Sequence, residues 1–261
     1  MGTAAVPVEA DDGRMSLIEH LTELRDRLIK VVIAVVVGMV LAFILYDPIF
    51  DFLIEPYRNL ARRDNDLSIS DGALLATDPL EGFGVRMKLA AYGGIFLAMP
   101  VILWQLWRFI TPGLYAHEKR YAIPFMVSAL TLFLLGAGIA YYTLPQALDF
   151  LQQIGGENIV TAYSPSKYFT LITYMMLAFG IGFEFPIVLV FAQMIGVLTP
   201  GALRSARRYA IVGICVLVAV ITPSGDPISM LALSVPMVLF YEVSILIGRV
   251  IERRKRVAEP A

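Results

Sequence analysis

The sequence predicts an all-α, polytopic membrane protein with six transmembrane helices and both termini in the cytoplasm. Three observations predict this class. First, the 261 residues are 58% hydrophobic and 16% charged, with a mean hydropathy of +0.72, whereas soluble domains are about 45–50% apolar and about 25% charged. Second, apolar runs long enough to cross about 30 Å of hydrocarbon recur along the chain. Third, Lys and Arg residues gather in alternate connections between these runs.

Six apolar runs predict the transmembrane helices in order. They cover about 28–46, 89–107, 121–144, 168–198, 209–221 and 228–248. The last two are short, and the thirteen residues of 209–221 reach only about 20 Å. Either the bilayer thins there or the hairpin 209–248 is re-entrant. We expect one membrane domain over 16–248, a disordered cytoplasmic tail over 1–15 and a basic cytoplasmic tail over 249–261.

The distribution of positive charge orients these spans. Fifteen of the 21 Lys and Arg residues fall before or at the very start of the first span, between the second and third, between the fourth and fifth, and after the sixth. Cytoplasmic connections carry the excess of positive charge, so both termini are predicted to be cytoplasmic. Aromatic residues at the span ends, Trp107 and Tyr168 among them, are typical of interfacial belts.

Composition argues against several function classes. The single cysteine, Cys215, cannot support a disulfide framework, and two histidines, His20 and His117, cannot build a multi-histidine metal centre. No phosphate-binding loop, nucleophile elbow or zinc-protease motif occurs. There is also no basic domain of the kind that binds nucleic acid. We therefore expect neither an enzyme nor a bound cofactor or metal.

An amphipathic helix over 16–30 is predicted to lead into the first span. Ser16 and Glu19 have the spacing of a capping box. Glu23 lies about 120° from the leucine face of this helix. It can therefore face a ligand, or it can pair with Arg27 four residues later, which is worth about 0.3–0.5 kcal/mol. Spacing alone favours the local pair.

The connection between the second and third spans holds a turn signal, Thr-Pro-Gly over 111–113, and an acid, Glu118, just before a basic pair. An acid at a helix start interacts favourably with the helix dipole. Spacing alone leaves a structural and a functional role for Glu118 equally open.

Glu184 is the residue that most needs an explanation. It lies near the middle of the fourth apolar run, where a charged acid costs a few kcal/mol. It should therefore be protonated, paired or facing a wet cavity. Pro186 frees the carbonyl of Gly182 from the helix, so the alternative is a neutral carboxyl that caps this backbone. Glu242, in the last span, can instead snorkel or pair with Arg249.

On the side of the membrane opposite the cytoplasm, Pro56 and Asp226 are each expected to mark a turn with a structural or functional role. The long connection 47–80 is punctuated by prolines, of which Pro56 lies within a short helix predicted over 48–60, on the membrane surface. The stretch 222–227 reads Thr-Pro-Ser-Gly-Asp-Pro. In it, Asp226 is predicted to be the N-cap of the last span, with Pro227 at the first helical position.

Four ordered stretches resemble one family, TatC, the multispanning core subunit of the Sec-independent, twin-arginine protein translocase. They are EHLTELRDRL over 19–28, FITPGLYAHEKR over 109–120, FGIGFEFP over 179–186 and TPSGD over 222–226. The resemblance runs from about residue 16 to 248. It implies a receptor for signal peptides that carry two consecutive arginines.

The resemblance also implies roles for individual residues. In the family, the acids that match Glu23 and Glu118 contact the two arginines, and Arg25 and Phe109 match further functional positions. The position of Glu184 is implicated in meeting a polar residue of a partner. The implied partners are single-span proteins of the TatA/TatB type, other copies of the chain and signal peptides of folded precursors. Transport would use the proton-motive force across a bacterial or archaeal cytoplasmic membrane.

A secondary transporter is the main alternative, with Glu184 as a proton- or ion-coupling acid. That class often carries internal repeats with broken helices in corresponding places. Only the fourth apolar run joins a mid-span acid to a proline, so the sequence shows no convincing repeat. A purely structural scaffold would leave Glu23, Glu118 and Glu184 without roles.

Overall fold

The computed structural model describes residues 17–63, 74–76, 78–110, 122–155 and 163–258. Within these ranges the chain forms nine α-helices and no β-strand, which confirms the predicted all-α class. The helices are α1 (Leu17–Ile44), α2 (Tyr46–Arg63), α3 (Glu81–Ile110), α4 (Ala122–Gly155), α5 (Pro165–Gly182), α6 (Phe185–Met194), α7 (Pro200–Ser205), α8 (Arg207–Ile221) and α9 (Pro227–Ala258).

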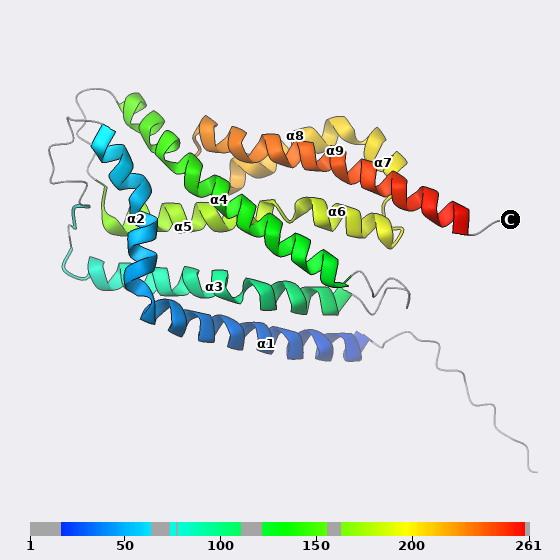
Figure 1. Cartoon of the computed structure of the whole chain (residues 1–261), viewed down its shortest axis with the longest axis horizontal. Helices are drawn as coiled ribbons and strands as arrows, with labels where there is room; N and C mark the ends of the chain where they lie inside the picture. Colours follow the sequence, from blue (N-terminus) through cyan, green and yellow to red (C-terminus); the bar gives the residue numbers. More distant parts are fainter. Residues whose placement is uncertain (1–16, 64–73, 77, 111–121, 156–162, 259–261) are drawn as a thin grey trace, which may run out of the picture.

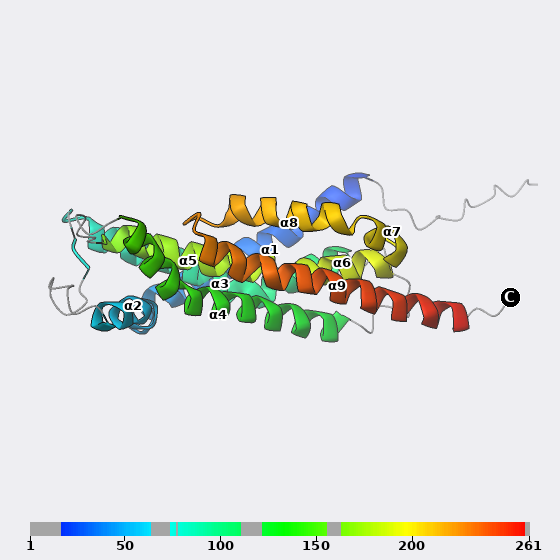
Figure 2. The ribbon, with the colours of Figure 1, turned by 90° about the horizontal axis from the view of Figure 1, so that it is seen from above.

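Most helices run along the long axis of the molecule, with α4 oblique to its neighbours (Figure 1). α2 lies across one end of the bundle, where it contacts α1, α3, α4 and α5. Figure 2 shows α8 on one side of α9 and α2 on the other side of the bundle. The start of α1, the end of α3, the start of α4 and the end of α9 share the end opposite α2.

We call the end opposite α2 the basic end, because most described cations lie on its helix termini. They are Arg25, Arg27, Lys30, Arg108, Arg204, Arg207, Arg208, Arg249 and Arg253. The end crossed by α2 has fewer among the described side chains, namely Arg58, Arg86, Lys88 and Lys167. This asymmetry agrees with the predicted cytoplasmic placement of the basic end.

Five stretches of helix are long and apolar enough to cross a membrane. They are Leu21–Ile44, Glu81–Phe109, Ile123–Gly155, Pro165–Met194 and Pro227–Arg253, and they correspond to five of the six predicted spans. The predicted fifth span is α8, whose 15 residues reach about 22 Å. The six-span count therefore holds only if this short helix crosses a thinner bilayer.

The last helix is longer than predicted. α9 has 32 residues and continues through Gly248 to Ala258, so the expected boundary between the membrane domain and a separate basic tail at 248 is not a helix end. The reason is local propensity, since the residues after Gly248 are mostly Arg, Lys, Glu and Ala, which favour helix. The first breaker comes only at Pro260. The predicted tail over 1–15 lies outside the described residues.

α1 packs along α3 at close range. A Cβ added to Gly38 would lie 2.5 Å from the carbonyl oxygen of Gly94, and one added to Gly94 would lie 2.7 Å from the backbone nitrogen of Met39. Two glycines facing each other thus let the helix backbones approach, as small residues do between membrane helices. The rest of α1 presents apolar side chains such as Val36 and Val40, both more than half exposed, to the surrounding lipid.

The short helix expected over 48–60 is present as α2, which packs onto the bundle. Its buried face consists of Leu53, Ile54, Tyr57 and Leu60, a helical repeat typical of an amphipathic segment. This burial raises the pKa of the Tyr57 hydroxyl. α2 is therefore held by the core of the protein on one face.

Pro56 lies inside α2, as the helix predicted over 48–60 implies, and does not form the turn that was also expected of it. A proline in a helix leaves the carbonyl four residues earlier without its donor, here that of Phe52. The Tyr141 hydroxyl of α4 donates to this carbonyl at 2.9 Å, and the Tyr168 hydroxyl of α5 donates to that of Leu53 at 2.7 Å. The Tyr141 phenol thus satisfies the carbonyl that the proline frees, and the Tyr168 phenol adds a hydrogen bond to the next carbonyl of α2.

Replacing Tyr168 by phenylalanine should destabilise the protein by about 1–2 kcal/mol, because Tyr168 is 1% exposed and its buried hydrogen bond to the Leu53 carbonyl would be lost. Thermal unfolding in detergent would measure the loss. Tyr142→Phe is the matched control, since Tyr142 is 77% exposed. Equal melting temperatures for both variants would mean that the phenol contributes nothing to docking of α2.

Asp226 occupies the N-cap position that the sequence predicts for the last helix. Its Oδ1 accepts from the backbone N–H of Ser229 at 2.7 Å, and its Oδ2 accepts from the Ser224 hydroxyl. Asp226 is 2% exposed, and Pro227 opens α9. Gly225 turns the chain with a positive φ of 59°, which glycine adopts without strain.

Replacing Asp226 by alanine should cost about 1–2 kcal/mol of stability, because the cap and its hydrogen bonds are lost together. Asp226→Asn is the control, since an asparagine oxygen can still accept from Ser229. Chemical unfolding in detergent should show a large loss for alanine and a small one for asparagine. Similar losses for the two would assign the effect to the charge and not to the cap.

Candidate functional site

An ion pair on α1 holds the first candidate residue. The Arg27 Nε donates to Glu23 Oε1 at 3.1 Å, and Nη2 donates to the same oxygen. The Arg27 side chain is 14% exposed and that of Glu23 22%. Glu23 Oε2 is buried, and no described residue donates to it. The local pair favoured by the spacing is therefore present, but it uses only half of the carboxylate.

Arg25 and Phe109 lie at the same end of the bundle as Glu23. Arg25 is 69% exposed and donates to Asp26 at 2.9 Å, so it points away from the packed face of α1. Phe109 is half-buried in the last turn of α3, the helix that lies beside α1. Glu23 and Phe109 thus belong to the neighbouring ends of two packed helices.

Glu118 and its segment, 111–121, lie outside the described residues. The helices on either side are described: α3 ends at Ile110 and α4 begins at Ala122. Both termini lie at the basic end, where α1 also begins (Figure 1).

Sequence reasoning missed an aromatic cluster that joins three helices near this end. The ring of Trp107 lies 4.5 Å from that of Phe125 and 5.6 Å from that of Phe191. Trp107 is only 5% exposed, so it does not serve the interfacial belt expected of it. Its ring contacts join α3, α4 and α6. Met99, Leu103 and Trp107 follow one another at four-residue intervals and are all buried, so this helical repeat was the available sign of burial.

Glu184 lies at the break between α5 and α6, in the middle of the span Pro165–Met194. The Glu184 N–H bonds the carbonyl of Ile181 at 3.0 Å, a tighter turn than in an α-helix, and Pro186 follows. The break therefore occurs where the proline predicts it.

The Glu184 side chain does not cap the freed backbone, so the capping alternative is wrong. It makes no capping hydrogen bond, and its Oε1 is buried with no partner among the described residues. A charged carboxyl at this depth is costly when one of its oxygens has no hydrogen-bond partner. Glu242, by contrast, accepts from Arg207 of α8 at 2.6 Å and not from Arg249.

Comparison with known proteins places these features in a family. The model of the family described as Sec-independent protein translocase protein (TatC) matches residues 19–236. The protein of that name from Aquifex aeolicus is 40% identical over 250 residues, covering 95% of this chain and 100% of that protein. The one from Frankia casuarinae is 39% identical, covering 94% of this chain and 68% of that protein.

The fold is shared as well. A crystal structure described as the twin arginine translocase receptor TatC superposes with a TM-score of 0.74 at 38% identity, covering 90% of this chain and 100% of that chain. A second crystal structure of the receptor gives the same TM-score at 39% identity. Since the family model, the relatives and the fold agree over most of its length, this chain belongs to the TatC family, the multi-pass membrane proteins of the Sec-independent translocase.

Proposed function

We propose that this chain is the receptor of a twin-arginine translocase and binds the paired arginines of signal peptides at its basic end. The precursors would be folded proteins exported across the cytoplasmic membrane. Single-span subunits of the TatA/TatB type and the proton-motive force would complete transport. The observation that supports this most is the half-used carboxylate of Glu23.

The Glu23 carboxylate suits a guanidinium ligand. Oε1 accepts from Arg27, while Oε2 receives no hydrogen bond from a described residue. A signal-peptide arginine can supply two parallel N–H donors, and such charge-assisted pairs are stronger than neutral hydrogen bonds. Lysine presents a point charge without this planar fork. A site built on carboxylates therefore distinguishes an Arg pair from a Lys pair.

Arg27 is the resting partner of Glu23 in this proposal. A carboxylate with low exposure needs a counter-charge when no ligand is present, and Arg27 supplies it from within α1. On binding, the peptide arginine would donate to Oε2, and the hydrogen bonds from Arg27 to Oε1 would weaken. Glu23 is thus positioned before the ligand arrives.

Glu118 is the proposed second acid of the site. Support comes from the described flanks of its segment, since α3 ends and α4 begins at the same end of the bundle as Glu23. Two carboxylates from separate segments can each take one arginine of the pair. Arg25 and Phe109 are proposed to line the same binding region, at the exposed surface of α1 and the end of α3.

Photocrosslinking tests the proposal. A photoreactive residue at Leu24, which is 43% exposed, or at Ala116 should label a signal peptide that carries Arg-Arg. The control position is Phe83, 67% exposed at the opposite end of α3. Labelling from Phe83 as strong as from Leu24, or no preference over a Lys-Lys peptide, would overturn the placement of the site.

A further inference from the structure

A pocket at the end crossed by α2 joins two lysines to an apolar wall. Its volume is about 380 Å³. It is lined by Lys88, Ser166, Lys167, Thr170, Leu171, Tyr174 and Pro223. These residues come from α3, from the first turns of α5 and from the turn between α8 and α9. The pocket lies at the opposite end of the bundle from the proposed arginine site.

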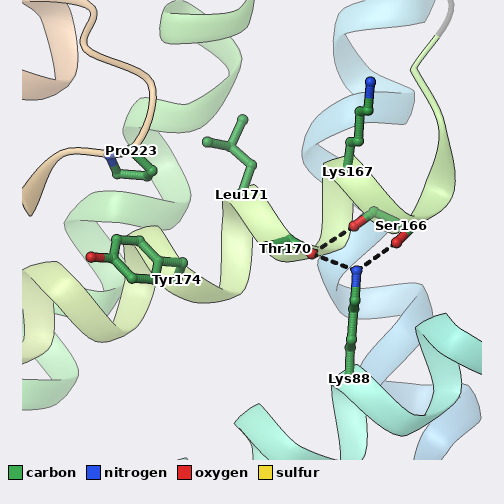
Figure 3. A pocket seen from close by; sticks show the side chains of 7 residues that line it. All are labelled: Lys88, Ser166, Lys167, Thr170, Leu171, Tyr174 and Pro223. Carbon is green, nitrogen blue, oxygen red and sulfur yellow. Dashed lines mark hydrogen bonds between the residues drawn. The ribbon is translucent and has the colours of Figure 1, made fainter.

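Lys88 is held in place by neutral groups. Its Nζ lies 2.5 Å from Ser166 Oγ and 3.1 Å from Thr170 Oγ1, so the ammonium rests between two hydroxyls on one face of α5 (Figure 3). The described carboxylates form no ion pair with Lys88. Glu81 accepts instead from the Ser164 hydroxyl and the Ser166 N–H. The hydroxyls position the charge of Lys88 without neutralising it.

The position of Lys88 along the membrane normal indicates which part of a lipid molecule can contact it. Between Lys88 and Arg108, α3 carries no charged residue for 19 positions, which is about 28 Å of helix. That length matches the hydrocarbon core of a bilayer, about 30 Å. With Arg108 at the cytoplasmic boundary, Lys88 lies at the outer boundary, where lipid phosphates and glycerol groups are found.

The remaining walls are suited to a molecule with both an anionic and an apolar part. Leu171, Tyr174 and Pro223 line the pocket across from the Lys88 ammonium (Figure 3). Lys167 is exposed and projects away from Lys88, which adds a second positive charge at the mouth. A free phosphate would use only the cationic part of the pocket and leave the apolar wall uncovered.

We propose that this pocket binds an outer-leaflet phospholipid through its phosphodiester, with Lys88 as the main contact. The hydroxyls of Ser166 and Thr170 hold the ammonium toward the phosphate, and the apolar wall covers the start of an acyl chain. Two lysines at one mouth favour an anionic lipid, such as phosphatidylglycerol, over a zwitterionic one. This site does not depend on the proposed receptor function.

Native mass spectrometry of the detergent-purified chain tests the site, with phosphatidylglycerol and phosphatidylethanolamine as probes. Each lysine near an anionic membrane surface contributes about 1 kcal/mol, so Lys88→Gln should lower phosphatidylglycerol binding about fivefold, and Lys88→Arg should restore it. Inorganic phosphate at millimolar concentration should not compete.

Arg86→Gln is the matched control. Arg86 lies at the same depth on α3, but its guanidinium lies over the rings of Phe43 and Tyr46, 4.8 and 4.7 Å from their centroids. Its loss should leave lipid binding unchanged, provided the melting temperature shows a folded protein. Equal lipid binding by Lys88→Gln and the parent would overturn the proposal. Displacement of the lipid by inorganic phosphate, or crosslinking of Tyr174 to a single-span subunit in place of lipid, would overturn it as well.

Discussion

Replacing Glu23 by glutamine should weaken binding of an Arg-Arg signal peptide about 30-fold. The substitution keeps the size of the side chain but removes the charge that a guanidinium requires. A charge-assisted hydrogen bond contributes about 1.5–3 kcal/mol, and 1.4 kcal/mol corresponds to a factor of ten in affinity. Because Glu23 is 22% exposed, solvent screens this interaction only in part. Titration of a labelled peptide against the chain in nanodiscs would measure the change.

Two comparisons separate recognition from a general loss of negative charge. Glu19→Gln removes the same charge from an exposed position one turn earlier in α1 and should change affinity less than about threefold, as expected of a screened surface charge. The parent should also prefer the Arg-Arg over a Lys-Lys peptide, and Glu23→Gln should reduce this preference. If Glu23→Gln binds both peptides as the parent does, Glu23 is not part of the arginine site.

Features set by local spacing could be predicted from the sequence. The Glu23–Arg27 pair follows from an i,i+4 interval, and the Asp226 cap follows from an acid before Pro227 at a helix start. The break near Glu184 follows from Pro186. Each depends on groups within four residues of one another, so the backbone geometry of a single helix decides it.

Features set by packing between helices could not be predicted in this way. A proline favours a turn, and the residues near Pro56 do not show which groups bond its helix. The hydroxyls that bond the carbonyls of α2 there belong to Tyr141 and Tyr168, 89 and 115 residues from their acceptors. Glu242 pairs with Arg207 across α8 and α9 because those helices lie side by side. No periodicity in one segment contains this information. The proposed roles of Glu118, Arg25 and Phe109 likewise come from the resemblance to the TatC family and not from spacing within one helix.

Replacing Glu184 by alanine should abolish export while leaving signal-peptide affinity within about twofold of the parent. The carboxyl lies at the break between α5 and α6, in mid-membrane and without a hydrogen-bond partner among the described residues for its Oε1. An ionisable group in that position destabilises the membrane-inserted protein unless it contacts a polar group. A polar side chain of a single-span subunit would satisfy it. Export of a twin-arginine reporter in cells and peptide titration in nanodiscs would measure the two effects separately.

Glu242→Gln provides the matched control, since Glu242 is another acid within a spanning helix but already has Arg207 as its partner. Its loss should lower the melting temperature and leave export of the folded fraction intact. Glu184→Gln keeps a hydrogen-bonding group and should retain more export than alanine. Because Glu184 makes no capping bond to its own chain, Glu184→Ala should melt close to the parent. A large loss of stability in that variant would instead assign Glu184 to the folding of the α5–α6 break and remove the case for a partner contact.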